Sequence, residues 1–187
     1  MLNLTLPHLT LDAFHGNQFH RIVLNAESRQ DRWTVLFFYP ADFTFVCPTE
    51  LADLAKQTDT LGAMGVDIFG VSTDTHFVHK AWFDASDTIR QVNYPLLADP
   101  THALSKALGV LNPETGLAER GTFVFDPHGK LVLLEVTMDG VGRNAEELVR
   151  KIKAAQWVYA HPGEACPAKW EEGQKTLKPS LDLVGKI

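Results

Sequence analysis

The sequence predicts an α/β protein in which helices flank a central mixed sheet. Two observations lead to this class. Apolar segments of strand length alternate with segments of helical periodicity, which favours parallel strands joined by helices. Later in the chain, the turn sequence Asp126-Pro127-His128-Gly129 separates two strand-like segments and predicts a hairpin that adds antiparallel strands.

The first predicted elements lead into and away from Cys47. Residues 33–39 form a nearly continuous apolar run that ends before Pro40, as in a strand buried on both faces. A helix is expected from Cys47, because Pro48 suits the first helical position. Its apolar positions continue on one face as far as Leu61, and we expect Gly62 and Gly65 to end it.

The remaining elements continue the alternation. A strand at 66–71 precedes a helix, for which Ser72, Thr73 and Asp74 offer caps. The later elements are expected to be a strand at 94–98, a short helix at 103–108, strands at 121–125 and 130–136, and a helix beginning near Asn144. This order is typical of a thioredoxin-like fold with extra pieces.

The length and composition fit one domain of ordinary size. The 187 residues are 45% hydrophobic and 21% charged, which provides enough apolar material for one core. We expect a thioredoxin-like domain at 1–158. The segment 159–187 is too short for a second domain and is expected to be a tail of the first.

The charge and hydropathy patterns exclude two classes of partner. The net charge is -6 and no basic run is present, which argues against binding to nucleic acid. No apolar run is long enough to span a membrane. Residues 1–7 lack the basic and long apolar stretches of a signal peptide, so we expect a cytoplasmic location.

Cys47 is the main candidate for catalysis. Backbone N–H groups at a helix start stabilise negative charge and so favour the thiolate, the nucleophilic form of cysteine. Thr44 could hydrogen-bond the thiolate or a peroxide. A purely packing cysteine is the alternative, but the surrounding loop and Pro48 count against it. A Cys-x-x-Cys oxidoreductase is also weakened, because Glu50 stands where its second cysteine would be.

Cys166 lies beyond the last predicted helix, in a loop rich in proline. A tail that carries one cysteine, on a core that carries another, suits a resolving thiol. Spacing alone leaves a bystander cysteine equally open.

Arg120 stands at the start of a predicted strand. It could stabilise a thiolate, or the charge that develops as an O–O bond breaks, or it could be an ordinary surface arginine. Glu50 could orient that arginine, or serve only as an acidic residue in the first turn of a helix.

The sequence predicts no bound metal or nucleotide. His76 and His79 have no third ligand at suitable spacing. Gly140-Val141-Gly142 lacks the strand-to-helix spacing of a dinucleotide-binding loop. Electrons for a redox cycle are therefore expected from a partner protein.

The segment from Phe38 to Glu50 resembles the active-site signature of the peroxiredoxins, Pro-x-x-x-Thr/Ser-x-x-Cys. Pro40, Thr44 and Cys47 occupy its defined positions. The resemblance is closest to the typical two-cysteine type, in particular the bacterial alkyl hydroperoxide reductase group. It extends over essentially the whole chain, through the segments 71–82, 160–170 and 179–187.

The resemblance implies a role for each matching residue. Cys47 matches the peroxidatic cysteine and Cys166 the resolving cysteine. Arg120 matches the active-site arginine, Thr44 the hydroxyl that contacts thiolate and peroxide, and Pro40 the residue that shields the pocket. The family pattern further implies a disulfide between Cys47 of one subunit and Cys166 of another, in dimers that assemble into decamers.

The resemblance also implies substrates and electron donors. The substrates would be hydrogen peroxide and organic hydroperoxides, and no cofactor would be bound. Electrons would come from NADH through an AhpF-like flavoprotein disulfide reductase, or from a thioredoxin-type donor. A redox-regulated chaperone or peroxide-signalling protein is the alternative function, for which the apolar tail leaves room.

Two segments depart from the family pattern. Gly121 follows Arg120 where alanine is usual, and residues 108–113 are unlike the usual stretch. These departures leave loop detail, subunit contacts and reductase preference open. The tail ends in Gly185-Lys186-Ile187 and lacks the Tyr-Phe ending of the relatives that are sensitive to overoxidation.

Overall fold

A computed structural model describes residues 2, 4–27 and 31–186. The chain forms two compact units, Met1–Ala145 and Glu146–Ile187. The sequence-based division at residue 158 stays a prediction.

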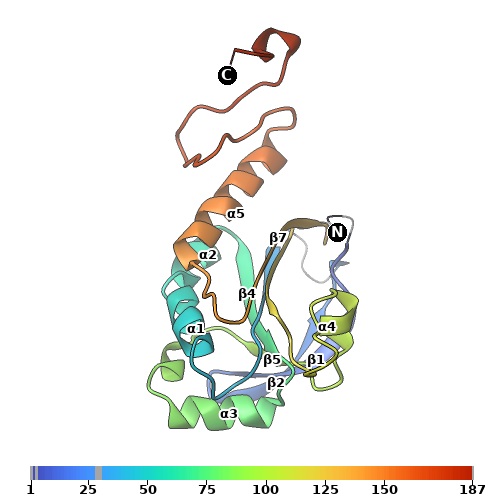
Figure 1. Ribbon diagram of the computed structural model, residues 1–187, viewed down its shortest axis with the longest axis vertical. Helices are drawn as coiled ribbons and strands as arrows, with labels where there is room; N and C mark the ends of the chain where they lie inside the picture. Colours follow the sequence, from blue (N-terminus) through green and yellow to red (C-terminus); the bar gives the residue numbers. More distant parts are fainter. Residues whose placement is uncertain (1, 3, 28–30, 187) are drawn as a thin grey trace. The chain divides into compact units, whose positions relative to one another are not determined.

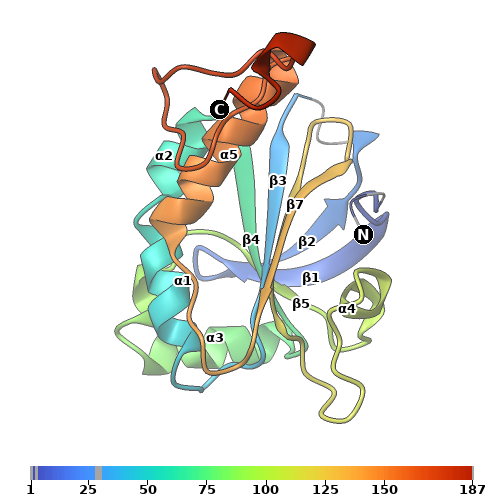
Figure 2. The same ribbon diagram turned by 45° about the horizontal axis from the view of Figure 1, so that its top comes forward.

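The larger unit is built on a seven-stranded mixed sheet, in the order β2-β1-β5-β4-β3-β6-β7 (Figures 1 and 2). The three central strands β5, β4 and β3 run parallel, and the outer pairs are antiparallel. The predicted mixed sheet flanked by helices is therefore confirmed. The strands are β1 (Leu9–His15), β2 (Gln18–Leu24), β3 (Trp33–Phe38), β4 (Val66–Ser72), β5 (Leu96–Ala98), β6 (Arg120–Phe125) and β7 (Leu131–Thr137).

Helices of the larger unit cover both faces of this sheet. In both ribbon views α1 and α2 lie on one side of the central strands and α4 lies on the other. All six residues of β3 are buried, as its continuous apolar run predicted. The helical elements are α1 (Cys47–Ala55), α2 (Thr58–Ala63), α3 (His76–Ala85), a 3-10 turn (Ile89–Gln91) and α4 (Ala103–Ala107).

Two local predictions were wrong. The helix from Cys47 was expected to continue without a break to Gly62 and Gly65, but it ends at Ala55 and a second helix follows from Thr58 to Ala63. At the break, the Thr58 hydroxyl lies within hydrogen-bond distance of the Ala55 carbonyl and of the Asn93 side chain, and its single proton can serve one of them at a time.

The cap of α3 was also misplaced. Thr75 provides it, with its hydroxyl accepting from the backbone N–H of Val78. Ser72 and Asp74 are engaged elsewhere: the Ser72 hydroxyl donates to the Asp74 carboxylate, which also accepts from the backbone N–H of Asp42.

The N-terminal hairpin of β1 and β2 had no counterpart among the sequence predictions. Gly16 and Asn17 join the two strands with φ of 57° and 62°. Two consecutive residues with positive φ form the type I′ turn that suits a two-residue hairpin. The pair Gly16-Asn17 was the available signal.

The smaller unit contains most of α5 (Ala145–Ala160) and a 3-10 turn (Leu181–Leu183). Trp170 is its anchor: the indole is 1% exposed and donates to the carbonyl of Gln174. An isolated bridge between Ala165 and Leu177 pairs the two sides of the tail. Across the described residues of both units, no helix is both long and apolar enough to span a membrane.

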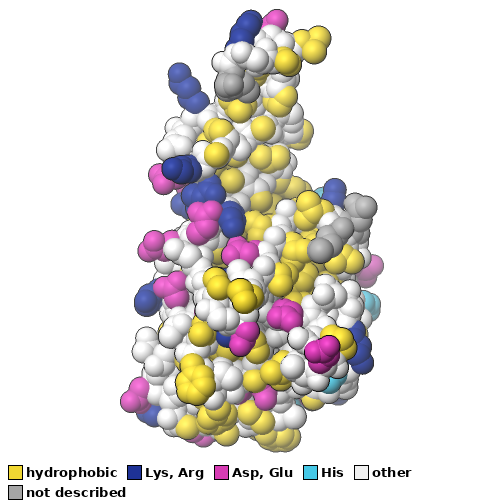
Figure 3. All heavy atoms as spheres, viewed as in Figure 1, with side chains coloured by type: hydrophobic (Ala, Val, Ile, Leu, Met, Phe, Trp, Pro, Cys, Tyr) yellow, Lys and Arg dark blue, Asp and Glu magenta, His cyan; other side chains and the backbone are white. Residues whose placement is uncertain are grey.

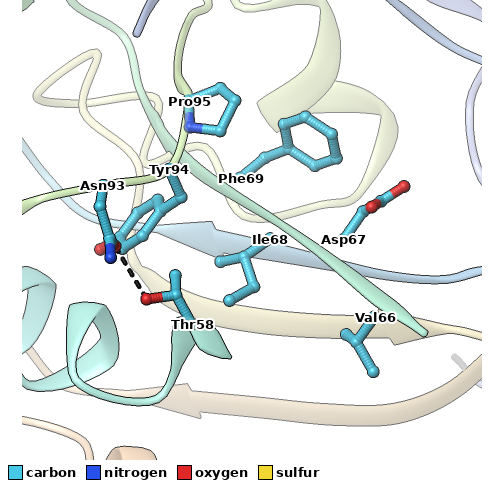
Figure 4. A pocket seen from close by; sticks show the side chains of 8 residues that line it. All are labelled: Thr58, Val66, Asp67, Ile68, Phe69, Asn93, Tyr94 and Pro95. Carbon is cyan, nitrogen blue, oxygen red and sulfur yellow. Dashed lines mark hydrogen bonds between the residues drawn. The ribbon is translucent and has the colours of Figure 1, made fainter. Parts of the chain in front are cut away.

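An open pocket of about 320 Å³ lies between α2, the first half of β4 and the segment before β5 (Figure 4). The Thr58 hydroxyl donates to the Asn93 side chain across it. The Tyr94 side chain forms part of its wall, and its hydroxyl donates to the Leu51 carbonyl in α1. None of the lining residues is among the sequence-predicted site residues.

Candidate active site

Cys47 is the first residue of α1 and has no exposed surface. Pro48 occupies the first turn, as predicted, and Glu50 is the acidic residue there. This position sets the sulfur at the positive end of the helix dipole, where a negative charge is stabilised.

Arg120 brings a buried cation to this sulfur. It is the first residue of β6, and its side chain is 3% exposed. One terminal nitrogen, Nη1, donates to Cys47 Sγ at 3.2 Å and to Glu50 Oε2 at 2.7 Å. Burial opposes the charge, but the contacts with Cys47 and Glu50 raise the pKa of Arg120. The structure thus places Arg120 at the sulfur rather than at the surface.

Glu50 links Arg120 to a second arginine, Arg143. The Arg143 backbone N–H and Nε donate to Glu50 Oε1 at 2.9 and 2.8 Å. The guanidinium also donates to the Phe38 carbonyl and lies 3.5 Å from the centre of the Phe37 ring. Burial lowers the pKa of Arg143, and the contact with Glu50 opposes this shift. Two buried cations therefore share one buried carboxylate beside Cys47.

Asp139 holds the opposite side of Arg120. The Asp139 carbonyl accepts from Arg120 Nε at 2.6 Å, and Asp139 Oδ1 accepts from Nη2 at 2.9 Å. The sequence analysis identified neither Asp139 nor Arg143, because each is a single charged residue in a loop without a local motif.

The loop before α1 carries Pro40 and Thr44. Pro40 is buried and Thr44 is half-buried. The Thr44 hydroxyl donates to the Ala41 carbonyl at 2.9 Å. Between them, Phe43 has a φ of 56°, which is costly for a bulky residue. The predicted contact of the Thr44 hydroxyl with thiolate or peroxide stays a prediction.

A buried polar pair anchors this loop to the core. Asp42 Oδ2 lies 2.7 Å from Nδ1 of His79, and Asp42 Oδ1 accepts from the Tyr39 hydroxyl. His79 Nε2 lies 3.2 Å from the Leu97 carbonyl. Burial raises the pKa of Asp42, while the His79 contact opposes the shift. His79 is thus a core residue that fixes the loop. No cluster of three or more metal-ligating side chains occurs among residues 2, 4–27 and 31–186.

Cys166 belongs to the smaller unit and is half-buried. Its sulfur lies 3.7 Å from the Ala154 carbonyl. Burial and the negative charge of Glu164 raise the pKa of Cys166. The Glu164 carboxylate accepts from Trp157 Nε1 at 3.1 Å and from the Thr176 hydroxyl at 2.6 Å. The surroundings of this thiol therefore favour its neutral form.

Comparison with known proteins decides the family. The AhpC/TSA family matches residues 3–133. The chain is a peroxiredoxin of this family. Residues 154–186, which include Cys166, match the C-terminal domain of 1-Cys peroxiredoxin. The resemblance inferred from residues 38–50 is confirmed.

Individual relatives match most or all of the length of this peroxiredoxin. Alkyl hydroperoxide reductase C of Salmonella typhimurium is 52% identical over 187 residues, which cover 100% of this chain and 99% of the relative. The crystal structure of Enterococcus faecalis AhpC has a TM-score of 0.84 at 44% identity, covering 88% of this chain and 98% of that one. The crystal structure of a reduced 2-Cys peroxiredoxin of Plasmodium vivax has a TM-score of 0.89 at 32% identity, covering 96% of this chain and 94% of that one. The thioredoxin-like fold and the activity class, a peroxiredoxin peroxidase, follow.

Proposed function

We propose that this peroxiredoxin reduces hydrogen peroxide and organic hydroperoxides, with Cys47 as the attacking thiolate and Cys166 as the resolving thiol. The observation that carries the proposal is the contact between Arg120 Nη1 and Cys47 Sγ at 3.2 Å, in a site where both residues are buried. A cation in this position stabilises the thiolate before attack and the oxygen that leaves after it.

In the first step, the Cys47 thiolate attacks the terminal oxygen of the hydroperoxide. An S–O bond forms and the O–O bond breaks, so the sulfur is oxidised to a sulfenic acid and the peroxide is reduced. The leaving oxygen takes a proton and departs as water or an alcohol. Thr44 would hydrogen-bond the reacting oxygens, and Pro40 would shield the sulfur from bulk water.

In the second step, the Cys166 thiol condenses with the sulfenic acid, forming an S–S bond and releasing water. A disulfide requires Cα atoms within about 7 Å of each other. Because Cys47 is fully buried in the first turn of α1, that turn must open before the disulfide can form.

We propose that this disulfide joins two subunits. The sheet order places β7 at an edge, where its backbone groups are available to a second copy. Val136 in this strand is 51% exposed. Phe43, Phe45 and Phe77 are each more than half exposed, which supports assembly of dimers into a larger ring such as a decamer.

The disulfide would be reduced by thiol exchange with a partner protein. The partner we propose is an AhpF-like flavoprotein disulfide reductase that draws on NADH, as the resemblance of residues 38–50 to the alkyl hydroperoxide reductase group implies. A thioredoxin-type donor is the other class of partner. We place this cycle in the cytoplasm and assign no prosthetic group to the chain.

A redox-regulated chaperone or peroxide-signalling role is the second candidate. Leu181 and Val184 are 91% and 75% exposed, and Figure 3 shows hydrophobic side chains at the surface of the C-terminal segment. Suppression of client aggregation by oxidised protein, without reductase-coupled turnover, would favour this role over the enzyme.

The test of the proposal follows both cysteines through one turnover. Stopped-flow mixing with hydrogen peroxide should give rapid oxidation of Cys47, and the oxidised protein should run as a covalent dimer on a non-reducing gel. Cys166→Ser should form the sulfenic acid once and then stall, because a disulfide reductase has no disulfide to attack. Full reductase-coupled turnover by Cys166→Ser would disprove the resolving role, and an intrachain disulfide would disprove the pairing between subunits.

A further inference from the structure

We propose that Asp139 is a positioning residue, which orients Arg120 toward the Cys47 sulfur. The inference rests on the proposed function, in which Arg120 assists the attack of Cys47 on peroxide. It adds a residue that does not touch the sulfur and acts only through Arg120.

The hydrogen bonds of Arg120 divide between two sides of its guanidinium. Asp139 accepts from Nε through its carbonyl, at 2.6 Å, and from Nη2 through Oδ1, at 2.9 Å. The remaining nitrogen, Nη1, donates to Cys47 and Glu50. Because the guanidinium is planar and rigid, fixing the edge formed by Nε and Nη2 also fixes the direction of Nη1. Asp139 therefore determines whether the charge points at the sulfur.

The exposed fraction of the Asp139 side chain indicates that Asp139 acts by orienting Arg120 and not by placing its own charge near the sulfur. The Arg120 side chain is 3% exposed, whereas the Asp139 side chain is 79% exposed. Water and ions screen the charge of an exposed carboxylate, so Asp139 has little direct effect on a buried sulfur. Its acceptor oxygen still fixes the geometry of Arg120. Glu50 differs from Asp139, because the Glu50 carboxylate is buried and is shared between Arg120 and Arg143.

The turn that carries Asp139 also supplies the second support of the site. The turn lies between β7 and α5 and is closed by two bonds: the Thr137 hydroxyl donates to the Val141 carbonyl, and the Val141 N–H donates to the Met138 carbonyl. Arg143, at its end, binds Glu50. One turn thus holds both neighbours of Cys47, Arg120 through Asp139 and Glu50 through Arg143.

Substitutions can separate the acceptor from the charge. Asp139→Ala removes Oδ1 but keeps the backbone carbonyl, and we expect the second-order rate of Cys47 oxidation to fall about tenfold. Asp139→Asn keeps an oxygen acceptor without the charge, and we expect it to retain most of the wild-type rate. Thermal unfolding should be unchanged in both, because the side chain is exposed.

The experiment is single-turnover stopped flow with hydrogen peroxide, on the full chain and across a pH series. Asp87→Ala is the matched control, because Asp87 is 92% exposed and pairs with another arginine, Arg90. Its rate should equal that of the wild type. Arg120→Ala and the double variant with Asp139→Ala complete a double-mutant cycle. If Asp139 acts through Arg120, adding Asp139→Ala to Arg120→Ala should change the rate no further, a result that a general structural role would not give.

The outcomes separate this inference from the function on which it rests. A wild-type rate for Asp139→Ala, with a slow Arg120→Ala, would overturn the positioning role alone. Equal losses for Asp139→Ala and Asp139→Asn would assign the effect to charge and would also overturn it. A wild-type rate for Arg120→Ala would instead overturn the proposed role of Arg120.

Discussion

The two cysteines of this peroxiredoxin lie in opposite electrostatic environments. Cys47 is fully buried at a helix start, with Arg120 as its hydrogen-bond donor. Cys166 is half-buried in a loop, where burial and the negative charge of its neighbour Glu164 raise the thiol pKa. The first sulfur therefore has a cation beside it and the second has an anion. This difference supports the proposed order of events, in which Cys47 reacts with peroxide and Cys166 reacts only after a sulfenic acid has formed.

The largest expected effect comes from exchanging the sulfur of Cys47 for oxygen. Cys47→Ser should abolish peroxide reduction, because a neutral hydroxyl cannot replace the thiolate nucleophile. The measurement is peroxide consumption by a variant shown to be folded by circular dichroism. Cys166→Ser is the matched control and should keep the first reaction with peroxide. Peroxidase activity in folded Cys47→Ser would contradict the proposal that Cys47, and not Cys166, attacks the peroxide.

Removal of the cation should have the next largest effect. Arg120→Ala should slow the attack on peroxide by about a hundredfold or more, because it removes the charge that stabilises thiolate and leaving oxygen. Stopped-flow rates at several peroxide concentrations would measure it. The rate of the later condensation with Cys166 should change far less. Equal slowing of both steps would mean that Arg120 does not distinguish the two cysteines.

A packing change beside Arg120 should alter the stability of the larger unit. A Cβ added at Gly121 would lie 2.8 Å from Val110 Cγ2 and 2.9 Å from Phe123 Cε2. Gly121→Ala should therefore lower the free energy of unfolding by about 1–3 kcal/mol. Urea unfolding of Gly121→Ala, Val110→Ala and the double variant would test it.

Part of the loss should be recovered in the double variant, because truncation of Val110 removes one of the two close contacts. Gly121 and the segment 108–113 are the two departures from the family pattern, and the structure places them against each other. Strict additivity of the two substitutions would contradict this packing link.

The smallest expected effect is a change in pH dependence at Cys166. Burial and the charge of Glu164 raise the pKa of this thiol, so less thiolate is present near neutral pH. Glu164→Gln removes the charge but keeps an oxygen acceptor for Trp157 and Thr176. The pH dependence of the condensation step should therefore move to lower pH, as measured by disulfide formation after a peroxide pulse. An unchanged profile would leave burial as the only cause of the shift.

The sequence alone identified the structural elements around Cys47 whose formation depends on residues close to one another in the chain. Pro48 after Cys47 marked the helix start, and the apolar run at 33–39 marked the buried central strand. These signals are local, because capping, turn formation and side-chain periodicity act over a few residues. The same local rules missed the break after Ala55, where the Thr58 hydroxyl also contacts Asn93, a residue far along the chain.

Only the tertiary structure decided which charges meet the sulfur. Arg120 was an open candidate from the sequence, and Asp139 and Arg143 were not candidates at all. The antiparallel pairing of β3 with β6 brings Arg120 to the end of the sheet where α1 begins, and the turn after β7 returns Asp139 and Arg143 to the same point. A single charged residue gives no periodic pattern in the sequence that predicts its partner, because strand register and loop conformation determine which charged side chains come into contact. The sequence therefore indicated Cys47 as the candidate nucleophile, and the fold determined the charges around it.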